Sequence, residues 1–166
     1  MAYLIIAGFS GIGKTTLGKK YKNVIDLDSA EYAYDDTDIS YLSLEQRKGM
    51  CRKKNKNWPE NYIKAINEAK EKYDYVLVWD RLDIINEYIK NNIDFILCYP
   101  SYSSLDIYKQ RYKDRGNSNE YIEKKIKEYD EKMKFFNKLN VEKIVLDGND
   151  TLENYLLRKG YNLIKK

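Results

Sequence analysis

Short apolar runs alternate along the chain with longer segments in which apolar residues recur at helical spacing. The short runs are rich in β-branched and aromatic residues and predict five buried strands, at Tyr3–Ala7, Val24–Leu27, Tyr75–Trp79, Ile93–Tyr99 and Val141–Leu146. The periodic segments predict helices at Lys14–Tyr21, Ser43–Cys51, Asn57–Tyr73, Leu82–Asn91, Ser103–Arg115, Asn117–Phe136 and Thr151–Lys159. Because strands and helices alternate, the sequence predicts an α/β fold whose five-stranded parallel sheet carries helices on both faces.

Two details of these helices follow from the positions of their apolar and capping residues. Leu82, Ile85 and Ile89 recur at helical spacing and are expected to face the core. Asn117 is expected to cap the long helix, because Glu120 follows three residues later as in a capping box.

The composition fits a single domain over residues 1–166 and narrows the chemistry available. The chain has no histidine, which excludes Ser-His-Asp triads, Cys-His dyads and zinc sites that need an imidazole. Cys51 and Cys98 are far apart in the sequence, so neither a disulfide scaffold nor a structural zinc site is predicted. The N-terminus lacks the basic leader of a signal peptide, and no apolar stretch approaches the length of a membrane span. We therefore expect a cytoplasmic protein that has no membrane partner.

Charge is distributed unevenly, although the net charge is only +4. Residues 26–38 contain six acids and no base, whereas residues 45–57 contain six bases and one acid. Such runs are usually solvated surfaces. The net charge is too small to require nucleic acid as a partner.

One motif carries specific chemistry. Residues 8–15, here called the glycine loop, read GFSGIGKT and fit the phosphate-binding pattern Gly-x-x-x-x-Gly-Lys-Ser/Thr. Glycines let successive backbone amides face phosphate oxygens, Lys14 reaches the β and γ phosphates, and Thr15 places a hydroxyl on magnesium. The loop therefore predicts ATP and Mg²⁺ as cofactors, and the alternative is a glycine-rich turn without a ligand. The candidate nucleotide-binding residues are Gly8, Ser10, Gly11, Ile12, Gly13, Lys14, Thr15 and Thr16.

A second segment extends this interpretation. Arg111 and Arg115 are four residues apart, so both side chains lie on one helix face and can point at a phosphate chain. The segment that they begin, RYKDRGNSNEYI, resembles the start of the lid in uridylate and cytidylate kinases, where Arg-x-x-x-Arg-Gly precedes a long helix. The alternative is a solvated helix face, or ion pairs with Asp106 or Asp114.

The order of elements and the glycine loop also resemble the adenylate kinase-like branch of P-loop kinases. This resemblance implies a P-loop three-layer sandwich with an acceptor-binding region at about residues 29–73 and a short lid at about residues 111–121. The chain departs from the pattern because it lacks the further Ser-Gly-Arg-x-Asp-Asp stretch of the lid.

Acids lie at the end of the second predicted strand, at the edge of the sheet where ligands bind. Asp26 and Asp28 are similar to the Asp-x-Asp of shikimate kinase, in which one acid supports magnesium and the other holds the acceptor hydroxyl. Asp28 also resembles the acid that serves as base in 5′-hydroxyl polynucleotide kinases. A helix N-cap is the alternative role for Asp28, because Ser29 follows it.

Four further residues are weaker candidates. Asp80 follows the third predicted strand, from which a carboxylate can steady hydrated magnesium, and a strand-end helix cap is the alternative. Arg81, next to Asp80, is a candidate substrate ligand. Arg47 and Arg52 are candidates to hold the phosphate of an acceptor, and a solvated basic surface is the alternative for both.

The leading hypothesis is a kinase that uses ATP and magnesium to phosphorylate a nucleoside or deoxynucleoside monophosphate. Lys14, Asp28, Arg111 and Arg115 are the candidate catalytic residues, and Thr15, Asp26 and Asp80 are the candidate metal ligands. A hydroxyl kinase with Asp28 as base is the first alternative, acting on a nucleoside, a small metabolite or a polynucleotide 5′ end. The second alternative is a nucleotide-binding switch with little turnover. We expect a small-molecule nucleotide acceptor rather than nucleic acid, and a monomer or homodimer.

Overall fold

The computed structural model describes residues 3–48 and 50–166. Five parallel strands form one sheet in the order β2-β3-β1-β4-β5. Their bounds are β1 Leu4–Gly8, β2 Val24–Asp26, β3 Tyr75–Trp79, β4 Ile96–Pro100 and β5 Lys143–Leu146. The register places Gly8, the last residue of β1, opposite Trp79 at the end of β3. β1 is the middle strand, so the glycine loop begins at the centre of the carboxyl edge.

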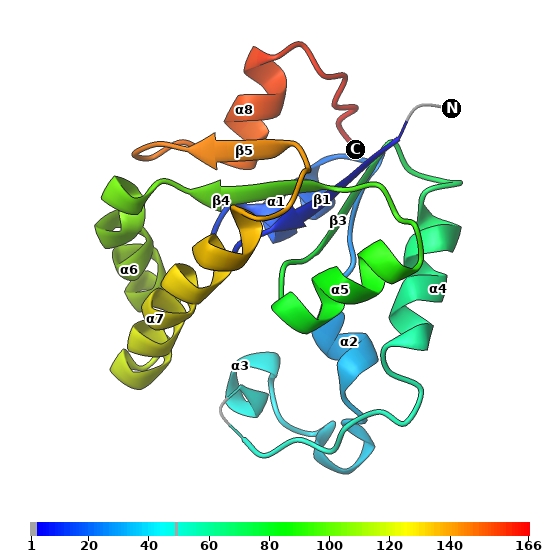
Figure 1. Ribbon diagram of the computed structural model, residues 1–166. Coiled ribbons are helices and arrows are strands. Elements are labelled where there is room, and N and C mark those ends of the chain that lie inside the picture. Colours follow the sequence, from blue (N-terminus) through cyan, green and yellow to red (C-terminus); the bar gives the residue numbers. More distant parts are fainter. Residues whose placement is uncertain (1–2, 49) are drawn as a thin grey trace.

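Helices cover both faces of this sheet. The described residues contain eight α-helices: α1 Lys14–Lys20, α2 Ser29–Ala33, α3 Leu44–Arg47, α4 Glu60–Ala69, α5 Leu82–Lys90, α6 Leu105–Asp114, α7 Asn119–Phe136 and α8 Leu152–Arg158. Two 3-10 helices are also present, η1 Thr37–Ile39 and η2 Tyr102–Ser104. The helices α1 and α8 lie on one face, and α4, α5 and α7 lie on the other (Figure 1). The predicted α/β architecture with five parallel strands between helical layers is confirmed.

Some predicted positions within the helices are wrong. Ile89 is exposed, while Ile84 and Tyr88 are buried together with Ile85, so α5 presents a different face to the core. The cap of α7 is Ser118, whose hydroxyl accepts from the Tyr121 amide at 3.2 Å.

Strand and helix bounds also differ from the predictions in places. The strand β4 begins at Ile96 rather than Ile93, and β5 begins at Lys143 rather than Val141. The helix predicted over 43–51 is helical only as α3, and Gly49 lies outside the described residues. The sequence did not predict α2 or η1, which are too short to show an apolar period.

The chain between α2 and α4 leaves the sheet and returns to its starting point. The Asp35 amide donates to the Lys53 carbonyl at 2.9 Å, and Tyr34 and Lys54 form an isolated antiparallel bridge. These contacts form a stem that closes residues 36–52 into a lobe. The lobe contains η1 and α3 and lies below the sheet in Figure 1.

Tyrosine hydroxyls hold the ends of the strands at the carboxyl edge. The Tyr62 hydroxyl donates to the Leu27 carbonyl at 2.9 Å and accepts from the Trp79 amide at 3.1 Å, which ties the end of β3 to the residue after β2. The Tyr88 hydroxyl donates to the Trp79 carbonyl at 2.9 Å. Another tyrosine, Tyr129, donates to the last residue of β4. These bonds fix the loops from which a ligand site at this edge is built.

Replacing Tyr62 with Phe is expected to destabilise the fold by about 2–3 kcal/mol, because a buried carbonyl and a buried amide both lose their partner. Urea denaturation measures this change as a lower midpoint with an unchanged slope. Tyr73→Phe is a matched control, since Tyr73 is only partly buried and its hydroxyl has no described hydrogen bond. An equal loss in both variants would contradict the assigned role of the Tyr62 hydroxyl.

Candidate active site

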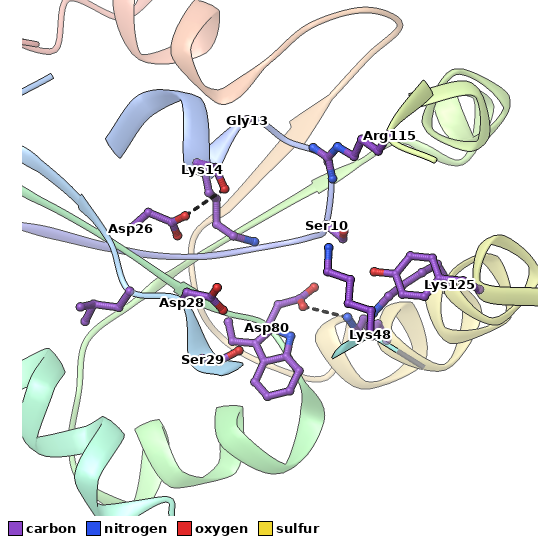
Figure 2. Close-up of a pocket in the computed structure, with 16 residues that line it drawn as sticks. Ser10, Gly13, Lys14, Asp26, Asp28, Ser29, Lys48, Asp80, Arg115 and Lys125 are labelled. Carbon is purple, nitrogen blue, oxygen red and sulfur yellow. Dashed lines mark hydrogen bonds and ion pairs between the residues drawn. The ribbon is translucent and has the colours of Figure 1, made fainter. Parts of the chain in front are cut away.

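A cavity of about 270 Å³ opens at the carboxyl edge of the sheet, beside the glycine loop. Ligands of open parallel sheets bind at this edge, because the loops that follow the strands converge there. Three groups of side chains line the cavity: those of the glycine loop, acids at or just after the ends of β2 and β3, and cations contributed by the ends of α3 and α6 and by α7 (Figure 2).

Glycines of the glycine loop adopt a backbone conformation that other residues rarely adopt. Gly11 and Gly13 have φ angles of 95° and 100°, a region in which a residue with a Cβ is strained. A Cβ on Gly8 would clash with the Ile12 side chain. In the described part of the chain, the amides of Gly11, Gly13 and Lys14 donate to no backbone oxygen. These donors are available to an anion.

Other residues of the loop support its shape. The Ile12 side chain is buried in the core, and its carbonyl accepts from the Leu152 amide at 3.1 Å. The Ser10 carbonyl accepts from the Tyr112 hydroxyl at 2.6 Å. Thr16 is exposed on α1 and does not line the cavity. The predicted nucleotide contacts of Ile12 and Thr16 stay predictions.

Lys14 begins α1 and points its ammonium toward the cavity (Figure 2). Its Nζ donates to the carbonyl oxygens of Gly8 at 2.5 Å and of Phe9 at 3.5 Å. Burial lowers the pKa of Lys14, and the nearby carboxylates of Asp80 and Asp26 oppose this change. The ammonium is thus held by neutral carbonyls, which a phosphate can replace.

Thr15 and Asp26 come together from α1 and β2. The Thr15 hydroxyl donates to Asp26 Oδ2 at 3.1 Å. Burial raises the pKa of Asp26, although the charge of Lys14 and the bond from Thr15 both favour its ionised form. Hydroxyl and carboxylate oxygens are ligands that magnesium accepts, so this pair fits the predicted metal role.

Asp80 forms a buried ion pair that the sequence did not reveal. Asp80 is 2% exposed, and its Oδ1 accepts from the Lys132 Nζ at 2.8 Å. Its Oδ2 has no partner among the described residues. Lys132 lies on the buried face of α7, three residues after Tyr129. A lysine at a core position of this helix is the only sign of the ion pair that the sequence offers.

These acids fit a magnesium ion that arrives with a nucleotide. Within residues 3–48 and 50–166, no group of three or more Asp, Glu or Cys side chains is arranged to hold a metal. Magnesium does not need one, because it usually binds one or two carboxylates together with water and substrate phosphates. The unpartnered Asp80 Oδ2 and the Thr15–Asp26 pair supply oxygens of this kind.

Asp28 is a helix cap that also borders the cavity. Its Oδ1 accepts from the Ala30 amide at 3.0 Å at the start of α2. The capping alternative is therefore confirmed. The carboxylate lines the cavity and also a neighbouring hollow that it shares with Tyr34 and Asp36. The role of Asp28 as a base stays a prediction.

Cations line the cavity on the side away from the strand ends. Figure 2 shows Arg115, Lys48 and Lys125 across the cavity from Asp26 and Asp28. Arg115 follows α6, Lys48 follows α3 and Lys125 lies on α7. Of these three cations, the sequence singled out only Arg115.

Arg111 lies outside the cavity and holds the glycine loop. Its Nη1 donates to the Gly11 carbonyl at 2.9 Å, and its Nη2 donates to the Asn149 carbonyl at 3.2 Å. The guanidinium stacks on the Tyr108 ring at 4.5 Å. The predicted contact between Arg111 and a phosphate stays a prediction, and the observed contacts give Arg111 a positioning role.

Arg47 and Arg52 both engage Asp36 and do not line the cavity. The Arg52 Nε donates to Asp36 Oδ1 at 3.0 Å, and its Nη2 donates to Oδ2. The Arg47 Nη1 lies 3.5 Å from Asp36 Oδ2. The two arginines are thus paired within the lobe rather than forming a free basic surface, and both line the hollow next to Asp28. Their predicted contact with the phosphate of an acceptor stays a prediction.

Arg81 is also paired away from the cavity. Its guanidinium donates to both carboxylate oxygens of Asp83, at 2.7 and 2.5 Å, and stacks on the Trp79 ring at 4.6 Å. Its predicted contact with a substrate stays a prediction.

The brace around Asp36 predicts a pH dependence of stability. Hydrogen bonds and charge from Arg52 hold the pKa of Asp36 below its ordinary value of 3.8. Because the folded state favours the carboxylate, this stabilisation is complete above the ordinary pKa and disappears as pH falls through the lowered one.

Asp36→Asn is therefore expected to cost about 1–2 kcal/mol of unfolding free energy at pH 7 and progressively less below pH 4. Urea denaturation of both proteins across this range measures the difference. The same experiment on Asp38→Asn, which changes an exposed acid of η1, serves as the control. A cost for Asp36→Asn that did not change with pH would contradict the brace.

Searches against protein-family models, curated proteins and solved structures found no match to this chain. None of the helices in the described ranges has both the length and the apolar character needed to cross a membrane.

Proposed function

We propose that the chain is a P-loop phosphotransferase that uses ATP and magnesium and acts on a nucleoside or deoxynucleoside monophosphate. The observation that carries the proposal is the cavity itself. The glycine loop, with unpaired amides and Lys14, faces Arg115, Lys48 and Lys125 across it. A site with cations on two sides suits a triphosphate donor and a second phosphate-bearing ligand.

In this proposal the donor phosphates lie along the glycine loop. The amides of Gly11, Gly13 and Lys14 bind phosphate oxygens, and the Lys14 ammonium leaves its carbonyl partners for the β and γ phosphates. Thr15, Asp26 and Asp80 would hold magnesium, which neutralises charge on the phosphates when it is bound.

The remaining cations act on the transferred group and its acceptor. Arg115 is exposed and lines the cavity, which supports a role in binding the phosphoryl group as its charge develops. Arg111 keeps the glycine loop in place from behind. Most of the rate would come from such positioning and charge stabilisation, because phosphoryl transfer leaves little covalent chemistry to the protein.

One observation supports the alternative of a hydroxyl acceptor. The Asp28 carboxylate lies where the cavity meets the neighbouring hollow, and only its Oδ1 is used by the helix cap. A hydroxyl bound in the hollow would need such a base, whereas a phosphate acceptor is already anionic. A polynucleotide acceptor has less support, because Arg47 and Arg52 are engaged with Asp36.

A coupled ADP-release assay with ATP and magnesium tests the proposal. The acceptor panel contains ribo- and deoxynucleoside monophosphates, nucleosides, shikimate and a 5′-hydroxyl oligonucleotide. Turnover on one monophosphate, at least tenfold above ATP hydrolysis alone, is the expected result. Activity only on a hydroxyl compound would replace the proposed acceptor and favour Asp28 as base. ATP binding without turnover on any acceptor would favour a nucleotide-binding switch.

A further inference from the structure

The buried Asp80–Lys132 pair lies next to a second lysine. Lys132 Nζ is 2.8 Å from Asp80 Oδ1 and 5.0 Å from the centre of the Phe9 ring. Both members of the pair line the same cavity as Lys14. Burial lowers the pKa of Lys14, and the charge of Asp80, with that of Asp26, opposes this change. Two lysines are therefore within the electrostatic reach of one buried acid.

The stability of the fold alone does not explain why a buried ion pair lies at this position. Removing two charges from water is costly, and apolar residues of similar size often stabilise a protein equally well at such positions. The pair is also only half satisfied, since Asp80 Oδ2 has no partner in the described part of the chain. A buried polar atom without a partner calls for an explanation in terms of the site that it faces.

Lys14 does not take the vacant oxygen. The described residues show no ion pair between Lys14 and Asp80, and the Lys14 ammonium instead donates to the carbonyls of Gly8 and Phe9. Those neutral acceptors bind an ammonium less strongly than a carboxylate does. The Lys14 ammonium can thus exchange its carbonyl acceptors for a phosphate at little cost.

We propose that Lys132 is a positioning residue that engages Asp80 and so prevents Asp80 from capturing Lys14. The inference rests on the proposed phosphate site at the glycine loop, but it requires neither magnesium nor turnover. Without Lys132, the negative charge of Asp80 is no longer compensated and attracts the Lys14 ammonium away from its carbonyl partners. Phosphate would then have to break an ion pair before it could bind.

The test measures the binding of inorganic tripolyphosphate in EDTA by titration calorimetry. Lys132→Met is expected to weaken binding about tenfold, because Lys14 is then held by a charged hydrogen bond. Adding Asp80→Asn to Lys132→Met removes the competing carboxylate and is expected to restore affinity to within about twofold of the unaltered protein. Lys132→Arg keeps the charge and is expected to bind like the unaltered protein.

Controls separate this mechanism from a general loss of charge or fold. Lys127→Met removes a cation from an exposed position of the same helix and is expected to change affinity less than twofold. Thermal unfolding is recorded for each variant. If Lys132→Met is unfolded at the assay temperature, Lys132→Gln with and without Asp80→Asn makes the same comparison with a neutral residue.

Different results would overturn the inference alone or the inference together with the proposed phosphate site. Unweakened binding by Lys132→Met, or a double variant as weak as the single one, would overturn the inference alone. No binding by the unaltered protein, or binding that Lys14→Ala leaves unchanged, would overturn the proposed phosphate site and the inference together.

Discussion

Lys14→Ala is expected to lower kcat/KM for ATP-dependent phosphoryl transfer by about a thousandfold or more. The lysine ammonium is the only side-chain charge that the glycine loop itself directs into the cavity, and its backbone acceptors are neutral. In the proposed reaction, removing it leaves the charge that develops on the transferred group without the ammonium of the glycine loop. The coupled ADP-release assay measures the loss on the acceptor identified by the panel.

Lys19→Ala is the matched control, because Lys19 is exposed on the same helix and does not line the cavity. Its activity is expected to stay within about twofold of that of the unaltered protein. A loss of less than tenfold in Lys14→Ala would contradict the proposal that the glycine loop binds the donor phosphates.

Arg115→Ala is expected to lower kcat by about a hundredfold to a thousandfold while changing the KM for ATP much less. Arg115 lines the cavity, and its guanidinium has no described hydrogen bond or ion pair within the protein. A contact that strengthens as charge develops acts on the transition state more than on the bound substrate. Steady-state kinetics with saturating acceptor separate the two parameters.

Lys113→Ala provides the comparison for Arg115, since Lys113 lies in the last turn of α6 and is exposed away from the cavity. An equal loss of kcat in both variants would indicate a general effect of charge. An unchanged kcat in Arg115→Ala would remove Arg115 from the chemistry.

The sequence predicted the strands and the glycine loop well, because both depend on local patterns. The central strand β3 was predicted with its observed bounds, Tyr75–Trp79, since both of its faces are buried and its apolar run is continuous. The glycine loop needs particular residues at fixed spacing, and the positive φ angles of Gly11 and Gly13 follow from that pattern.

The positions of the arginines could not be predicted in the same way. Arg47 and Arg52 meet Asp36 through a fold of the intervening chain, and no local spacing reveals that pairing. Arg111 and Arg115 share a helical spacing of four, yet one contacts the Gly11 carbonyl and the other faces the cavity. Which of two such residues faces the cavity depends on how the rest of the fold packs around the helix.

The sequence did not predict the lysines of the cavity, for a related reason. Lys48, Lys125 and Lys132 reach the cavity from α3 and α7, which are distant in sequence from the glycine loop. In a chain rich in lysine, only the burial of Lys132 distinguishes it from its neighbours, and burial is a property of the fold. The sequence likewise showed no sign that several tyrosines hold the strand ends with their hydroxyls.

The stem formed by Tyr34, Lys54 and their neighbours makes the length of the lobe independent of the sheet. Both ends of residues 36–52 emerge side by side, so the length of chain between them is not dictated by the sheet. Closing a longer or shorter loop at a fixed stem alters its entropy only slowly with length. The lobe is accordingly a place where insertions, deletions or an exchanged segment can change the side of the cavity that Lys48 lines, while the sheet and the glycine loop keep their structure.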